Sequence, residues 1–186
     1  NNGVVVAKEH TGGIIGHMNC IGDNDKGESL LVENCENKAD LSKGTVGGII
    51  SSFMSETGDV TIKGCTNSGV LTSDGQHCAG IVAYWIMNSK PEETHIVIDG
   101  CKNTGDINSS LNAGGIISFM DMPVCLEKGK DVSISVSNCS NSGKVTTSST
   151  NGYIGGILAN WGMENISTTI SKCTNSGTLS VTAAAD

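Results

Sequence analysis

The stretch Val60-Thr61-Ile62-Lys63-Gly64-Cys65-Thr66-Asn67-Ser68-Gly69-Val70-Leu71 contains the pattern Cys-x-Asn-x-Gly, with an aliphatic residue two positions after the Gly. The same pattern returns three more times, and a degenerate copy precedes it. The further copies span residues 101–105, 139–143 and 173–177, and the degenerate copy spans residues 35–39. This repetition predicts the fold more directly than any other feature of the chain.

A second block, Gly-Gly-Ile-Ile or a close variant, separates the copies at residues 12–15, 47–50, 79–82, 114–117 and 155–158. The motif Asn marks the phase of the repeat at Asn1, Asn37, Asn67, Asn103, Asn141 and Asn175, with spacings of 36, 30, 36, 38 and 34 residues. A fixed period of this length is typical of a solenoid, which grows by stacking units. We expect one repeat domain over residues 1–186, with repeats at 1–36, 37–66, 67–102, 103–140 and 141–174 and a partial repeat at 175–186. Because both ends fall inside a repeat, we also expect a segment of a longer array.

Three short strands are predicted in each period. They are the Gly-Gly-Ile-Ile block, the alternating run before Cys, and the residues after the motif Gly. Successive copies lying about 4.8 Å apart would pair in parallel. The sequence therefore predicts an all-β, right-handed parallel β-helix of about five coils with a Cys ladder and an Asn ladder. The handedness follows from the preference for right-handed crossovers between parallel strands.

Five of the eight cysteines occupy one repeat position, namely Cys35, Cys65, Cys101, Cys139 and Cys173. We expect them to be buried and unlinked, because the parallel Cα–Cβ vectors of a ladder disfavour the torsion of a disulfide. The redox state of Cys20, Cys78 and Cys125 stays open. The motif Asn is expected to bond nearby backbone in a left-handed corner, with the motif Gly supplying a positive φ.

The chain carries a net charge of −8, and its eleven basic residues are all Lys. Without Arg, and with this acidic balance, nucleic acid and anionic membrane surfaces are unfavourable partners. No run is apolar enough for a transmembrane helix, so no membrane insertion by this segment is expected.

Few residues are candidates for catalysis or metal binding. The carboxylates Asp59, Asp99, Asp106, Asp121 and Asp131 fall at non-equivalent repeat positions, so no acid and base pair of the glycosidase kind is predicted. The runs His17-Met18-Asn19-Cys20 and His77-Cys78 lack a second Cys-x-x-Cys. We therefore predict no catalytic residue, no metal and no cofactor.

Aromatic residues gather at the fourth or fifth place after the Gly-Gly pair: Phe53, Tyr84, Trp85, Phe119 and Trp161. One interpretation is a platform that stacks sugar rings or docks a partner protein. The other is an apolar patch that covers one corner of the coil, and the two differ in exposure. The predicted ligand site combines these five aromatics with the variable loops at residues 88–94 and 121–131.

The order Gly-Gly-Ile-Ile-Gly (residues 12–16), aliphatic-x-Asn-Cys (32–35) and Val-Gly-Gly-Ile-Ile (46–50) resembles the GLUG-type repeat of bacterial cell-surface proteins. The resemblance covers essentially the whole chain. Such repeats occur in large extracellular proteins of Gram-positive and gut bacteria, some immunoglobulin-A-cleaving proteases among them. The resemblance implies a stalk or adhesive module that is separate from any catalytic domain.

These observations predict a non-catalytic, extracellular or cell-surface bacterial module, adhesin-like or stalk, which binds a glycan or a host protein and meets neighbouring repeats or copies end to end. Two alternatives remain: a carbohydrate-active β-helix lyase or hydrolase, and an ice-binding solenoid with Thr rows such as Thr146-Thr147 and Thr178.

Overall fold

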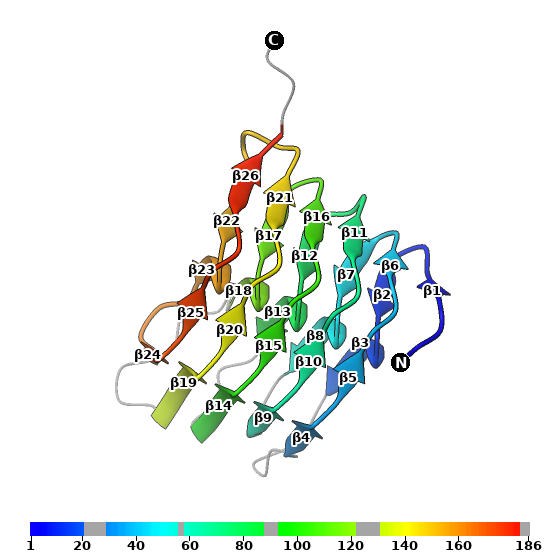
Figure 1. The fold of residues 1–186 in the computed structure, drawn as a ribbon. Coiled ribbons are helices and arrows are strands. Elements are labelled where there is room, and N and C mark those ends of the chain that lie inside the picture. The colour runs from blue at the N-terminus through cyan, green and yellow to red at the C-terminus, as the bar shows by residue number, and fades with distance from the viewer. Residues whose placement is uncertain (21–28, 56–57, 88–92, 122–130, 183–186) are drawn as a thin grey trace.

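The computed structural model describes residues 1–20, 29–55, 58–87, 93–121 and 131–182, and every regular element in these ranges is a β-strand. The strands form a parallel β-solenoid in which each coil stacks on the next (Figure 1). The motif Asn sets the register, because Asn67 pairs with Asn37 on one side and with Asn103 on the other. The predicted all-β solenoid is thus confirmed. Within the described ranges there is no helix long and apolar enough to cross a membrane.

Five parallel sheets run along the solenoid, each named here by its first strand. The β1 sheet contains β1 (Val5–Val6), β6 (Leu41–Ser42), β11 (Leu71–Ser73), β16 (Ile107–Ser109), β21 (Val145–Thr147) and β26 (Leu179–Val181). The β2 sheet contains β2 (His10–Gly12), β7 (Thr45–Gly47), β12 (His77–Ala79), β17 (Asn112–Gly114) and β22 (Ile154–Gly155). The β3 sheet contains β3 (Ile15–Cys20), β8 (Ile50–Ser55), β13 (Val82–Met87), β18 (Ile117–Asp121) and β23 (Leu158–Gly162).

The remaining two sheets close the coil. The β4 sheet contains β4 (Leu30–Glu33), β9 (Val60–Lys63), β14 (Glu93–Asp99), β19 (Asp131–Ser137) and β24 (Ser167–Ser171). The β5 sheet contains β5 (Glu36–Asn37), β10 (Thr66–Asn67), β15 (Lys102–Asn103), β20 (Ser140–Asn141) and β25 (Thr174–Asn175). In Figure 1 the β1, β5 and β4 sheets follow one another down the near side of the molecule.

The prediction of three strands per coil was wrong in detail, because each coil has five. The runs before Cys and after the motif Gly are strands as predicted. The Gly-Gly-Ile-Ile block is a corner: its first Gly ends a strand such as β7, and its second Ile begins the next strand, β8. The motif Asn, predicted as a left-handed corner, lies in a two-residue strand. The prediction of a positive φ at the motif Gly was also wrong, because in each coil a residue with positive φ lies directly before the ladder Cys instead: Asn34, Gly64, Gly100, Asn138 and Lys172.

The interior is divided into two apolar cores. The larger core lies between the β3 and β4 sheets and includes Ile50, Ile62 and Trp85. The smaller core lies between the β1 and β2 sheets and includes Leu71 and Cys78. These two cores are separate groups of contacting side chains, so some other part of each coil must pass between them.

The two cores are separated by the contact between the second Gly of the Gly-Gly corner and the motif Asn. A Cβ placed on Gly80 would lie 2.6 Å from Asn103 Cβ and 2.4 Å from Gly115 O. Gly48 and Gly115 meet Asn67 and Asn141 at the same short range. The corner therefore folds inward onto the Asn ladder and pinches each coil into two lobes. We call this contact the waist.

The Asn ladder is hydrogen-bonded throughout. Asn67 Nδ2 donates to Asn103 Oδ1 at 2.8 Å and also to Gly69 O at 3.0 Å. Asn103 repeats the scheme with Asn141 Oδ1 at 2.7 Å and Gly105 O at 2.8 Å. Both side chains are fully buried. Each side-chain amide donates one hydrogen bond to a backbone carbonyl of its own turn and one to the Asn of the next coil. Burial of these polar side chains therefore carries little desolvation cost.

The Cys ladder is also present. Cys65, Cys101 and Cys139 are buried, Cys35 and Cys173 at the ends are half-buried, and all five are free thiols. Their thiols donate to backbone carbonyls, as Cys139 Sγ does to Ser137 O at 3.1 Å. Cys78 is a further free thiol, buried in the smaller core, where burial raises its pKa. Cys125 and the side chain of Cys20 lie outside the described residues.

Candidate functional site

The five aromatics predicted as one ligand site are separated by the alternation of the β3 sheet. Phe53 and Trp85 are paired in register, and both point into the larger core, with 1% and 0% of their surface exposed. Trp161, in register with Met120, packs half-buried against the same core. The prediction that these three form a binding surface was wrong, because the fifth residue after the Gly-Gly pair faces inward.

Tyr84 and Phe119 occupy the fourth position after the Gly-Gly pair and face outward. They are neighbours in register, half-buried, and their rings stack at 5.5 Å with an interplanar angle of 16°. His77 on β12 adds a third ring, 5.0 Å from Tyr84 and 4.8 Å from Phe119. The outer faces of the β2 and β3 sheets therefore turn toward each other across the Gly-Gly corner.

In the first coil, two imidazole rings from the β2 and β3 sheets come together in the same way. His10 on β2 and His17 on β3 stack with centroids 5.1 Å apart. Between the two ring groups lies an open groove of about 540 Å³ on the concave outside of the waist. Its lining combines rings, hydroxyls and turn backbone from Lys8, Glu9, His10, His17, Gly44, Thr45, Ser52, Met54, Gly75, Gln76, His77 and Tyr84.

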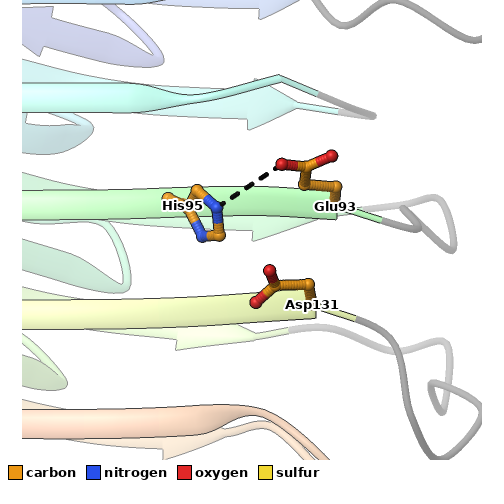
Figure 2. A group of neighbouring side chains, drawn as sticks. All are labelled: Glu93, His95 and Asp131. Atoms are coloured by element: carbon orange, nitrogen blue, oxygen red, sulfur yellow. Dashed lines mark ion pairs between the residues drawn. The ribbon is translucent and has the colours of Figure 1, made fainter.

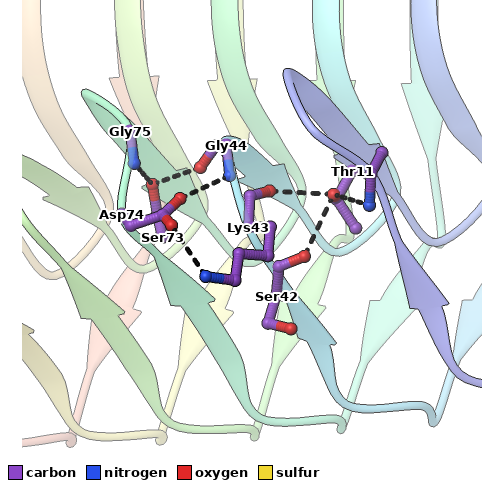
Figure 3. A network of polar contacts seen from close by, with 8 residues as sticks. Thr11, Ser42, Lys43, Gly44, Ser73, Asp74 and Gly75 are labelled. Atoms are coloured by element: carbon purple, nitrogen blue, oxygen red, sulfur yellow. Dashed lines mark hydrogen bonds and ion pairs between the residues drawn. The ribbon is translucent and has the colours of Figure 1, made fainter.

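One wall of the groove is stiffened by a network of turn hydrogen bonds (Figure 3). Ser73 Oγ donates to Gly44 O at 2.7 Å and accepts from the Gly75 backbone N–H at 3.2 Å. Asp74 accepts from the Gly44 N–H at 2.6 Å and forms an ion pair with Lys43 at 3.3 Å. These contacts lower the pKa of Asp74 and fix the turns of two adjacent coils against each other. The wall is thus preformed, as a binding site requires.

The central part of the groove is polar but uncharged near neutral pH. Burial lowers the pKa of His77 to about 4, so its imidazole is neutral. Burial and the neighbouring His17 lower the pKa of His10. Burial and nearby Asp121 raise the pKa of Tyr84, so its hydroxyl keeps its proton. The groove therefore offers neutral hydrogen-bonding groups beside aromatic rings.

The His77→Asn variant should lose part of the acid sensitivity of the fold. Between pH 6.5 and 4 the unfolded chain binds a proton at this residue and the folded protein does not, so stability falls as the pH falls. Over this range the expected loss is about 2 kcal/mol in the wild type. Asn is the residue at the same register in the next coil, Asn112, so the substitution suits the position.

Urea unfolding at pH 7 and at pH 4.5 measures this effect as the difference between the two proteins. Other titrating groups, His10 included, are common to both and cancel. The same decrease in stability for wild type and His77→Asn would contradict a pKa of His77 lowered by burial.

Three of the carboxylates singled out in the sequence join successive coils. Asp59 accepts from the backbone N–H of His95 at 2.8 Å, and Asp106 accepts from that of Lys144 at 2.9 Å. Asp99 accepts from Ser137 Oγ and from Asn138 Nδ2, each at 2.7 Å, and these bonds lower its pKa. Asp99 ends β14, whereas Asp59 and Asp106 lie in segments that precede β9 and β16, so the three do not form one acidic site.

Of two other predicted surfaces, one is contradicted and the other lies largely outside the described residues. Thr147 of the Thr146-Thr147 pair is fully buried, and its hydroxyl donates to Leu111 O at 2.6 Å, so it cannot belong to an exposed Thr row. Of the two loops assigned to the ligand site, residues 88–92 and 122–130 lie outside the described residues.

Sequence reasoning missed the three groove histidines. For His17 the missing signal was the alternation itself: position four after Gly-Gly is His17, Ser52, Tyr84, Phe119 and Asn160 in successive coils, which are one outward row. His10 and His77 lie on the neighbouring β2 sheet, and no pattern in the sequence places them beside this row. In comparisons with known proteins, no family model matches the chain, and neither the curated proteins nor the solved structures gave a match.

Proposed function

We propose that this chain is a non-catalytic module of an extracellular bacterial surface protein and that the groove outside the waist binds a glycan. The observation that carries the proposal is the make-up of the groove, where the Tyr84 ring and neutral imidazoles lie beside hydroxyl and amide groups. Sugars present apolar ring faces and many neutral hydroxyls, so they need both kinds of partner at once.

The size and the charge of the groove favour a short oligosaccharide over a protein partner. A volume of about 540 Å³ lies within the range of small-ligand sites, whereas a protein partner needs a broad surface. Glu9 is the single carboxylate in the described lining of the groove, while hydrolysis of a glycoside ordinarily needs two. We therefore favour binding without cleavage.

The stacked coils would serve such a module by holding the groove at a distance from the cell surface. Every coil is fixed to the next by parallel backbone pairing, by the Asn ladder and by the carboxylates that accept from the next coil. A rod built in this way keeps its ligand site preorganised, which lowers the entropy cost of binding. The stalk and the adhesive roles are then compatible in one chain.

The test is a glycan array followed by calorimetry on the best binder, with the variants Tyr84→Ser and Phe119→Asn. Each substitution introduces the residue found at the same register in a neighbouring coil, Ser52 and Asn160, so the fold should tolerate both. Loss of a stacking ring should weaken binding at least about tenfold for Tyr84→Ser.

Leu31→Ser is the matched control, because Leu31 is 62% exposed on the β4 sheet, away from the groove residues. Its affinity should equal that of the wild type. Binding that survives Tyr84→Ser would remove this groove as the site, because Tyr84 is the ring of this stacked pair that lines it. Turnover of any polysaccharide would remove the non-catalytic proposal, and binding to a host protein stripped of glycans would exclude a glycan as the ligand.

A further inference from the structure

A second cluster of functional groups lies on the outer face of the β4 sheet, where β14 and β19 pair in register from Glu93 and Asp131 onward. Glu93 and His95 are two residues apart on one strand, so they share a face. Asp131 lies opposite Glu93 on the next coil (Figure 2). One ligand atom from each of the three side chains lies within 4.8 Å of the other two.

The strand register places two carboxylates side by side, and a bound cation would relieve their repulsion. Glu93 and Asp131 are directly opposite each other on adjacent strands, and like charges in that position are destabilising. Their side chains are held there by seven consecutive residue pairs between β14 and β19. A divalent cation between the two carboxylates would convert this repulsion into attraction.

The cluster also interrupts the repeat. In the column that contains His95, the following coils carry Ser133 and Ser167. Those coils carry small hydroxyl side chains at this position, and the coil of β14 carries an imidazole. A site confined to one pair of adjacent coils must depart from the repeat in this way, whereas a structural ladder would not.

His95 is oriented for ligation by its other ring nitrogen. Nδ1 lies 3.0 Å from Ser133 Oγ, and Nε2 faces Glu93 Oε1 at 3.9 Å. When Nδ1 carries the proton and donates to Ser133, Nε2 presents its lone pair toward Glu93 Oε1. Metal-binding histidines are commonly held by such a second hydrogen bond.

We propose that Glu93, His95 and Asp131 form a binding site for a divalent first-row transition ion of the Zn²⁺ type, which links two adjacent coils. One imidazole nitrogen and two carboxylate oxygens suit such an ion, whereas Ca²⁺ takes oxygen ligands. Small rotations of the exposed carboxylates bring the ligand atoms to bonding distance, and water completes the coordination. The proposal is independent of the glycan groove.

The experiment is titration calorimetry of the folded chain with ZnCl₂, repeated with MnCl₂ and CaCl₂, on wild type, His95→Ser and Asp131→Asn. Ser is the residue at the same register in the next coil, and Asn keeps the shape of Asp. His17→Ser is the matched control, because His17 stacks on His10 and has Ser52 as its register partner. If the groove histidines bind Zn²⁺ instead, the His17→Ser variant should lose that binding.

We expect Zn²⁺ to bind wild type and His17→Ser with affinities within about twofold, and to bind His95→Ser and Asp131→Asn at least about tenfold more weakly. Zn²⁺ should also raise the melting temperature of the two binding proteins and leave that of the other two unchanged. Absence of Zn²⁺ binding to wild type, unchanged affinity in His95→Ser and Asp131→Asn, or Ca²⁺ binding as tightly as Zn²⁺ would each overturn the proposal.

Discussion

Asn103→Asp is expected to destabilise the solenoid by about 4 kcal/mol. The amide of Asn103 donates to Asn141 Oδ1 and to Gly105 O, and it accepts from Asn67 Nδ2. A carboxylate keeps the acceptor and loses both donors, so a buried charge then faces two oxygens. Taking up a proton would restore one donor only. Urea unfolding followed by far-ultraviolet circular dichroism measures the loss.

Asn175→Asp provides the control, because the chemical change and the ladder position are the same. Asn175 accepts from Asn141 and donates to Gly177 O, but its side chain is exposed. Water can hydrate the carboxylate and the released carbonyl, so we expect a loss below about 1 kcal/mol. Equal losses at Asn103 and Asn175 would show that burial of the ladder contributes nothing to its strength.

Gly80→Ala should cost about 3 kcal/mol and is the second large effect. The added methyl group would meet Gly115 O at 2.4 Å and Asn103 Cβ at 2.6 Å. Both neighbours belong to the buried waist, where the ladder hydrogen bonds hold Asn103 and a backbone bond to Gly155 O holds Gly115. The same unfolding measurement applies, and weaker protection of the Asn103 and Asn67 backbone amides in hydrogen exchange should accompany it.

The adjacent residue is the matched control. Ala79 occupies the first position of the corner, where Gly47 and Gly114 are its register partners, so a methyl group is already accommodated there. Ala79→Gly should change stability by less than about 1 kcal/mol. If Gly80→Ala proves as mild as Ala79→Gly, the waist is not a close backbone contact and the division into two cores loses its explanation.

The waist also links the fold to the proposed function. Because Gly80 has no side chain, the corner can fold inward onto Asn103, and the outside of the coil becomes concave at that point. The outward side chains of the two flanking strands then converge, which places His77 against Tyr84. A solenoid with a convex corner would hold the same two residues apart, and no groove would form.

The repeat in the sequence was sufficient to predict a parallel β-solenoid, but not the number of strands in each coil. Cys-x-Asn-x-Gly recurs at a nearly constant spacing, and identical residues stacked coil on coil satisfy one another, as Asn67 does with Asn37 and Asn103. The run before Cys, as in Val60-Thr61-Ile62, alternates and forms the predicted strand β9. These features depend on the local residue pattern and on its repetition along the solenoid axis, and both can be recognised in the sequence.

The tertiary structure alone decided which face each aromatic takes and where the coil bends inward. Trp85 and Tyr84 are adjacent and both aromatic, yet one is fully buried and the other lines the groove. Hydrophobicity does not distinguish them; the side of the strand does, and the path of the whole coil sets that side. The meeting of Gly80 with Asn103, and of Glu93 with Asp131, likewise depends on backbone positions fixed by all five sheets at once.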